Sequence, residues 1–317
     1  NLRKSLPLSS PFHNSSLNCS IKAIDLFDEK LKKLIDEKIS EPENSLELIF
    51  ANVLKKEKLR EVRGENLEKI ELTEDQIQEI EEKFLCRISK MPTQYILKEW
   101  EFRDLKLNMK IPVFIPRPET EELVELISQK LSPKKNYKIL EIGCGSGCIS
   151  LSLLNEHEAI DEIIAVDQSK SACELTLENA KKLDLSHRLK VCKHKLENDG
   201  LLPTDIVPLD LKFDLIISNP PYVPSKDSLK LQPEIYLYED IRALDGGKEG
   251  LDVINSLLNL SANYLKPKGS LWLEIDDRHP EIIAKIVENN AEKWNLKFMS
   301  TYKDIFKKNR FVEIEKC

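Results

Sequence analysis

The sequence contains no apolar run of about 18 residues, the length that a helix needs to cross a bilayer, so we expect no membrane-spanning segment. Its seven cysteines are an odd number and include no Cys-x-x-Cys pair, which favours reduced thiols in an intracellular compartment over a disulfide framework. Cys144 and Cys148 lie four positions apart with no pair of histidines nearby. This spacing argues against a zinc site, and we predict no bound metal.

An excess of basic residues is also missing. The 48 Lys and Arg residues are outnumbered by 55 Asp and Glu residues, which gives a net charge of −7. This balance argues against a protein that grips a nucleic-acid backbone over a broad surface, although a local basic groove remains compatible with it. The length of 317 residues allows one large domain or two ordinary ones.

Residues 1–24 lack acidic side chains altogether, and the first acid is Asp25. The segment carries six serines, two prolines and the basic residues Arg3, Lys4 and Lys22. This composition fits an organellar transit peptide and equally an ordinary disordered tail, and we exclude the segment from the fold. A transit function would direct the protein to mitochondria, and a bacterial cytoplasm is the alternative.

Residues 25–92 have the apolar spacing of a small helical bundle, which we interpret as a substrate-recognition domain. Thr73 and Gln76 form a capping box ahead of one of its helices. In residues 93–118, apolar side chains alternate at Leu105, Leu107 and Met109, which predicts a short hairpin linking two domains. After this linker a helix is expected, capped by Glu119 or Thr120. The alternative for this motif is that the rigid, Pro-flanked segment 115–121 lies along a cofactor pocket.

A β-branched strand over 138–142 runs directly into a glycine-rich loop made of Gly143, Cys144, Gly145, Ser146 and Gly147. Glycines at alternate positions let a backbone turn sharply and approach a ligand closely. The next strand, over 163–166, ends in Asp167, where an acid is placed to bind ribose hydroxyls. A simple strand-end cap is the alternative for Asp167.

A dinucleotide and S-adenosylmethionine both fit this strand, loop and acid. The Gly-x-Gly-x-Gly spacing, preceded by Glu141, favours the methyl donor over NAD. We predict that Glu141 binds the ammonium group of the cofactor. An NAD-dependent oxidoreductase remains as a weaker alternative.

The stretch Phe213–Ser218 predicts a buried strand that ends in Asn219-Pro220-Pro221-Tyr222. Two prolines hold the backbone extended and offer carbonyl oxygens without neighbouring N–H groups. Asn219 adds an amide and Tyr222 adds a flat ring with a polar tip. These groups suit a planar NH2 group, held by two acceptors and stacked on the ring, and a turn without chemistry is the alternative. The long segment 223–250 that follows is interpreted as a lid or substrate wall.

Four motifs are similar to those of the HemK/PrmC family of protein glutamine N5-methyltransferases and occur in the same order. They are PTQYIL at 92–97, IPRPETEELVE at 115–125, SNPPYV at 218–223 and EDIRALDGGKEGLD at 239–252. The resemblance covers about residues 85–315. The resemblance implies an α/β class I S-adenosylmethionine-dependent methyltransferase over 119–317, with a Rossmann-like, mostly parallel seven-stranded sheet. It also implies methylation of the glutamine in the Gly-Gly-Gln motif of class I peptide-chain release factors. We expect a monomer without stable nucleic-acid or membrane partners.

By the same resemblance, residues 143–147 and Asp167 hold the cofactor, and Asn219 and the Pro220 carbonyl hold the glutamine amide. Pro221 and Tyr222 would shape the slot, and Asn219 would also lie near the methyl donor. Leu196 would line the adenine pocket.

The sequence departs from the family pattern in three places: Lys98 stands for a glycine, Asp240 for a proline, and Lys195-Leu196 for an acid followed by an aromatic residue.

The expected mechanism is alignment of the amide nitrogen with the methyl group, without a dedicated general base, and loss of the proton to water after transfer. Two alternatives remain. The same slot would fit the exocyclic amine of a DNA or RNA base, which would need base flipping. A catalytically silent cofactor-binding scaffold is the other alternative.

Overall fold

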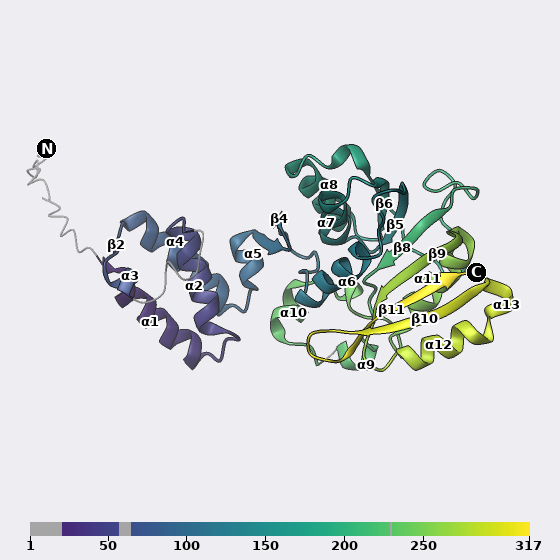
Figure 1. Ribbon diagram of the computed structural model, residues 1–317. Helices are drawn as coiled ribbons and strands as arrows, with labels where there is room; N and C mark the ends of the chain where they lie inside the picture. The colour runs from purple at the N-terminus through teal and green to yellow at the C-terminus, as the bar shows by residue number, and fades with distance from the viewer. Residues whose placement is uncertain (1–20, 57–64, 229) are drawn as a thin grey trace, which may run out of the picture. The chain divides into compact units, whose positions relative to one another are not determined.

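The computed structural model describes residues 21–56, 65–228 and 230–317. The chain divides into two compact units, Asn1–Ile88 and Ser89–Cys317 (Figure 1). Among the described residues, no helix combines the length and apolar character needed to cross a membrane.

The first unit is helical, as its apolar spacing indicates. Its helices are α1 (Ala23–Asp36), α2 (Pro42–Val53), α3 (Glu65–Glu68) and α4 (Glu74–Ile88). They enclose a core that includes Phe27 and Phe50, whose rings meet edge to face at 5.2 Å. The predicted capping box is confirmed, since Gln76 N donates to Thr73 Oγ1 and Thr73 N donates to Gln76 Oε1.

Residues 21–24 belong to this unit, and their exclusion from the fold was therefore wrong. β1 (Ile21–Lys22) pairs antiparallel with β2 (Glu71–Leu72), and α1 begins at Ala23. A two-residue strand has no periodicity of its own, so only its partner about 50 positions away could have revealed it. Residues 1–20 lie outside the described residues.

The second unit is built on one sheet with the strand order β10-β11-β9-β8-β5-β6-β7. β11 runs antiparallel to both of its neighbours, whereas the pairs from β9 to β7 are parallel. The predicted mostly parallel seven-stranded sheet is therefore confirmed. The strands are β5 (Tyr137–Ile142), β6 (Ile160–Asp167), β7 (Leu189–Lys193), β8 (Phe213–Ser218), β9 (Leu265–Glu274), β10 (Leu296–Lys303) and β11 (Asn309–Lys316).

Helices cover both faces of this sheet (Figure 1). One face packs against α6 (Pro118–Ser128), α7 (Cys148–Glu156) and α8 (Lys170–Lys182), and the short η2 (Ser186–Arg188) leads into β7. The other face packs against α11 (Asp252–Tyr264), α12 (Pro280–Asn289) and α13 (Ala291–Trp294). Because both faces are covered, β8 is buried at every position, which explains why its apolar residues Leu215, Ile216 and Ile217 follow one another without alternation.

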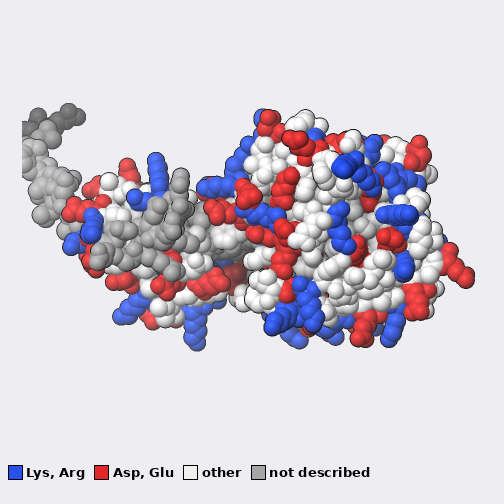
Figure 2. Space-filling model, viewed as in Figure 1, with Lys and Arg blue, Asp and Glu red and all other residues white. Residues whose placement is uncertain are grey.

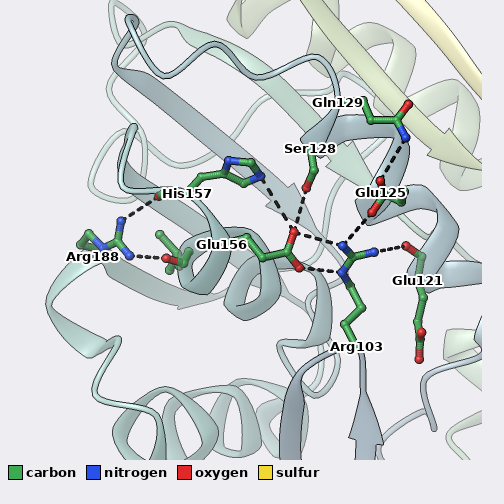
Figure 3. A network of polar contacts seen from close by, with 9 residues as sticks. Arg103, Glu121, Glu125, Ser128, Gln129, Glu156, His157 and Arg188 are labelled. Atoms are coloured by element: carbon green, nitrogen blue, oxygen red, sulfur yellow. Dashed lines mark hydrogen bonds and ion pairs between the residues drawn. The ribbon is translucent and has the colours of Figure 1, made fainter.

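The predicted hairpin is formed by β3 (Glu99–Phe102) and β4 (Leu105–Asn108), which follow α5 (Thr93–Leu97). Arg103, at its turn, donates from Nε to Glu156 Oε1 at 2.6 Å and from Nη2 to Glu125 Oε2 at 2.8 Å (Figure 3). Ser128 Oγ donates to the same Glu156 carboxylate at 3.0 Å. These charge-assisted bonds fasten the hairpin turn to α6 and to the end of α7.

The order of the central strands fixes where a ligand can bind. From β5 the chain proceeds to β6 and β7 on one side and then returns to β8 on the other side of β5. The order in which strands are added to the sheet therefore reverses between β5 and β8, although the two strands are parallel. In open parallel sheets, the crevice at the carboxyl ends of the two strands flanking such a reversal is the usual ligand site. The glycine loop, residues 143–147, follows β5, and the Asn219–Tyr222 segment, here called the amide slot, follows β8.

Candidate active site

A cavity of about 550 Å³ lies at this edge of the sheet. Ten of the twelve predicted site residues line it: Glu141, Gly143, Cys144, Gly145, Ser146, Asp167, Leu196, Asn219, Pro220 and Pro221. Gly147, the N-cap of α7, and Tyr222, which packs against the apolar core, do not line the cavity. The structure therefore brings the glycine loop, the acid after β6 and the amide slot to one space.

The glycine loop needs glycine for two different reasons. Gly145 and Gly147 have φ values of +57° and +84°, in the left-handed region that side chains disfavour. A β-carbon on Gly145 would meet no atom within 4 Å, so this position faces open space in the cavity. A β-carbon on Gly147 would lie 2.9 Å from Leu151 Cδ1, because α7 starts there and packs closely.

Asp167 shapes the loop as well as facing the cavity. Its Oδ2 accepts from Gly145 N at 3.0 Å and its Oδ1 accepts from Ser169 N at 2.8 Å. Burial raises the pKa of this carboxyl, although the two backbone donors oppose that shift. The carboxylate therefore keeps the glycine loop in place and leaves its remaining lone pairs for a ligand hydroxyl.

Glu141 is a buried carboxyl that has one oxygen without a partner. Ser150 Oγ donates to Glu141 Oε2, whereas Oε1 has no hydrogen-bond partner among the described residues. Burial raises the pKa of Glu141 to about 8. An acceptor left open in this position, 1% exposed and lining the cavity, is suited to a ligand ammonium group.

A backbone strap over residues 111–117 forms another wall, with Val113, Phe114 and Pro116 lining the cavity. Buried Glu239 holds it, accepting from Arg117 Nη2 at 2.7 Å and from Ile115 N at 3.2 Å. The Pro-flanked segment was expected to lie along a cofactor pocket, and Pro116 does line the cavity. Its anchor Glu239 could not be predicted from the sequence, because it lies more than 120 positions away.

Two of the three family departures also lie on the cavity wall. Asp240 N donates to Pro112 O at 2.8 Å, a bond that a proline at position 240 could not make. Its carboxylate accepts from Arg242 Nε and Nη2 and thereby draws Arg242 to the cavity. Lys195 and Leu196 also line the cavity, and Leu196 packs against the apolar core.

The amide slot presents two acceptors. Asn219 Nδ2 donates to Thr120 Oγ1 at 3.1 Å, which turns Asn219 Oδ1 away from Thr120. Among the described residues, neither Asn219 Oδ1 nor the Pro220 carbonyl receives a hydrogen bond from the protein. The slot also adjoins the glycine loop, since a β-carbon on Gly143 would lie 3.8 Å from the Asn219 carbonyl oxygen.

Thr120 does not cap α6, so that interpretation of the sequence was wrong, and Glu119 does not cap it either. The N-cap is Arg117, and α6 begins with Pro118, which fits its first position. Thr120 Oγ1 donates instead to Glu274 Oε2 at 2.8 Å, and Tyr222 Oη donates to Glu274 Oε1 at 3.1 Å. Thr120 and Glu274 are the polar residues behind the slot that sequence reasoning missed.

The segment 223–250 is not one open loop, because it includes α9 (Ser225–Ser228), α10 (Pro233–Tyr238) and η3 (Ile241–Ala243). It returns to the slot at Gly246, whose N–H donates to Val223 O at 2.8 Å. A β-carbon on Gly246 would lie 2.5 Å from the Pro221 carbonyl oxygen. The second half of the segment therefore forms a wall in backbone contact with the slot.

The described residues contain no group of three or more His, Cys, Asp or Glu side chains arranged to hold a metal ion. On the face drawn in Figure 2, basic and acidic side chains of residues 89–317 are interspersed, and the described part of that face carries no continuous basic field. This face offers no broad phosphate-binding surface.

This fold and this cavity define a methyltransferase domain, and a family model described as "Methyltransferase domain" matches residues 133–314. The chain is 40% identical over 288 residues to the MTRF1L release factor glutamine methyltransferase of Homo sapiens, with 88% of this chain and 82% of that protein covered. It is 32% identical to the release factor glutamine methyltransferases of Fusobacterium nucleatum (93% and 79% covered) and Thermodesulfovibrio yellowstonii (93% and 99% covered). The chain belongs to the release factor glutamine methyltransferase family, which confirms the resemblance seen in its motifs.

Proposed function

We propose that this protein transfers a methyl group from S-adenosyl-L-methionine to the side-chain amide nitrogen, N5, of the glutamine in the Gly-Gly-Gln motif of a class I release factor. The observation that carries this proposal is the pair of open acceptors, Asn219 Oδ1 and the Pro220 carbonyl, beside the glycine loop. Two acceptors match the two hydrogens of a primary amide.

The cavity fits the cofactor on three counts. Open space at Gly145 admits a close approach, the unpartnered Glu141 Oε1 suits the amino-acid ammonium, and Asp167 suits the ribose hydroxyls. Leu196, partly buried against the core, offers an apolar surface to the adenine ring. When bound, S-adenosylmethionine supplies an electrophilic methyl group on a sulfonium that needs no acid to leave.

The residues of the chain act by position. An amide nitrogen is a poor nucleophile because its lone pair is delocalised into the carbonyl. Asn219 Oδ1 and the Pro220 carbonyl accept its two hydrogens, which directs the lone pair out of the amide plane toward the methyl group. Alignment of this kind supplies roughly 7–11 kcal/mol in well-oriented systems. Pro221 and Tyr222 keep the slot in shape, and the proton leaves to water after transfer.

The partner follows from the same proposal: a class I release factor bound through its Gly-Gly-Gln loop, with the helical unit of residues 25–92 in substrate recognition. We further propose a mitochondrial location, supported by the basic, serine-rich and acid-free composition of residues 1–20, the part of the expected transit segment that lies ahead of β1. Expression of the protein from its own gene with a fluorescent tag at the C-terminus tests the location, and a diffuse cytosolic signal would refute it.

The central experiment measures methyl transfer from labelled S-adenosylmethionine to a purified class I release factor. The matched substrates are its Gly-Gly-Gln→Gly-Gly-Ala variant and duplex DNA, and the matched enzyme is Asn219→Ala. We expect label on the wild-type factor alone and none with Asn219→Ala, whose cofactor affinity should change little. Label on DNA would make the protein a base methyltransferase, and label on neither would support a silent scaffold.

A further inference from the structure

Glu274 is a buried acid that the proposed mechanism does not use. It ends β9, is 1% exposed, and lies beside the amide slot because β9 pairs with β8 up to Ser218. Its two oxygens accept from two hydroxyls, Thr120 Oγ1 at 2.8 Å and Tyr222 Oη at 3.1 Å. Both hydroxyls lead back to the slot, one through Asn219 and one through Tyr222 itself.

The direction of these hydrogen bonds follows from proton counting. An ionised carboxylate only accepts, so the single Thr120 hydroxyl proton is donated to Glu274. The Thr120 oxygen then has only lone pairs left, so the group of Asn219 that faces it must be the NH2 end. The Asn219 oxygen is thereby turned to the opposite side, where the substrate amide would enter.

We propose that Thr120 and Glu274 are positioning residues of methyl transfer, which fix the Asn219 amide with its oxygen toward the substrate nitrogen. This inference rests on the proposed function. The two hydrogen bonds that join Glu274 to Thr120 and Thr120 to Asn219 are here called the relay. Without the relay, the Asn219 amide can rotate by 180° and set its own NH2 against the NH2 of the substrate, so that two donors oppose each other. The slot would then lose one of its two acceptors.

The protonation of Glu274 should control this relay. A protonated Glu274 can donate to Thr120, and Thr120 can then donate to Asn219, which reverses the amide. Burial raises the pKa of Glu274 to about 7, while the Thr120 and Tyr222 hydroxyls and Arg310 on β11 lower it and Glu119 on α6 raises it. Transfer should therefore slow as the pH falls through about 7.

The test compares Thr120→Val, which keeps the shape of the side chain without the hydroxyl, with Thr120→Ser, which keeps the hydroxyl. Thr301→Val, the same change on β10, is the matched control. With the full chain, a release factor and labelled cofactor, we expect Thr120→Val to lower kcat about 10- to 100-fold, as a lost orienting contact does. KM for the release factor and the Kd for cofactor should stay near wild type, and Thr120→Ser should recover most of kcat.

A second variant keeps the proposal testable if Thr120→Val does not fold. Glu274→Gln removes the titrating group, so its kcat should lose the fall below pH 7 that the wild type shows. Wild-type kcat in Thr120→Val, or an unchanged pH profile in Glu274→Gln, would overturn the positioning role while the proposed function stands. Absence of release-factor methylation by the wild type would overturn the proposed function, and the positioning role with it.

Discussion

Gly246→Ala offers a direct test of the slot geometry. The φ value of Gly246 is outside the left-handed region, so alanine meets no backbone strain there. Its new methyl group would lie 2.5 Å from the Pro221 carbonyl oxygen and 2.9 Å from the α-carbons of Tyr222 and Gly250. All three are backbone atoms, which no side-chain rotation can move aside.

The slot must therefore withdraw by about 1 Å to restore ordinary van der Waals contact. A displacement of this size between reacting atoms costs on the order of 100-fold in rate, or about 2.7 kcal/mol of transition-state stabilisation. Cofactor binding should be unchanged, because the glycine loop after β5 and Asp167 at the end of β6 form other walls of the cavity than Gly246 does. We thus expect a loss confined to kcat.

The assay is single-turnover methyl transfer to a release factor, together with calorimetric titration of the cofactor. Gly145→Ala is the matched control, since its methyl group would project into open cavity space from a residue at φ +57°. That variant should weaken cofactor binding at least about tenfold, because it combines strain with lost space. Turnover of Gly246→Ala within twofold of wild type would refute the contact between this wall and the slot.

Two further predictions concern single side chains. Lys98 adopts φ +62° where the related family has glycine, so Lys98→Gly should raise the unfolding free energy by about 0.5 kcal/mol, measured by urea denaturation. Lys98→Ala keeps the β-carbon and should show no such gain; equal gains in both variants would exclude backbone strain as the cause. Burial raises the pKa of Glu141 from 4.5 to about 8, so the cofactor-free folded chain holds a proton that the unfolded chain releases between these values. Stability contributed by this group therefore falls as the pH rises from about 5 to 8. Glu141→Gln should lose this part of the pH dependence of Tm and bind the cofactor more weakly, and parallel Tm profiles would contradict the assignment.

Local sequence patterns were sufficient to predict the parts of the site that consist of one strand and the loop that follows it. Asp167 ends an apolar strand, and the glycine loop and Asn219 each follow one directly. Parallel strands carry such residues to one edge of the sheet. The resemblance added the amide substrate. These features could be predicted because each is encoded within a few residues.

Features that depend on distant partners could not be predicted in this way. Thr120 near a helix start is typical of a cap, yet Arg117 occupies the cap position and Thr120 bonds Glu274. Glu274 itself ends a strand like many solvent-facing acids, and only the pairing of β9 with β8 buries it beside the slot. The short helices within 223–250 were missed because four to six residues carry no measurable period.

The relay of Thr120, Asn219 and Glu274 also has a kinetic consequence for assembly of the protein. Its bonds join residues 99 and 154 positions apart, so long chain closures must precede them. Asn219 emerges from a ribosome long before Glu274, and the nascent chain passes through a stage in which the slot sequence exists without the acid that orients it. Methyl-transfer competence therefore begins only after β9 has been added to the sheet, and a refolding assay should detect it later than the helical signal.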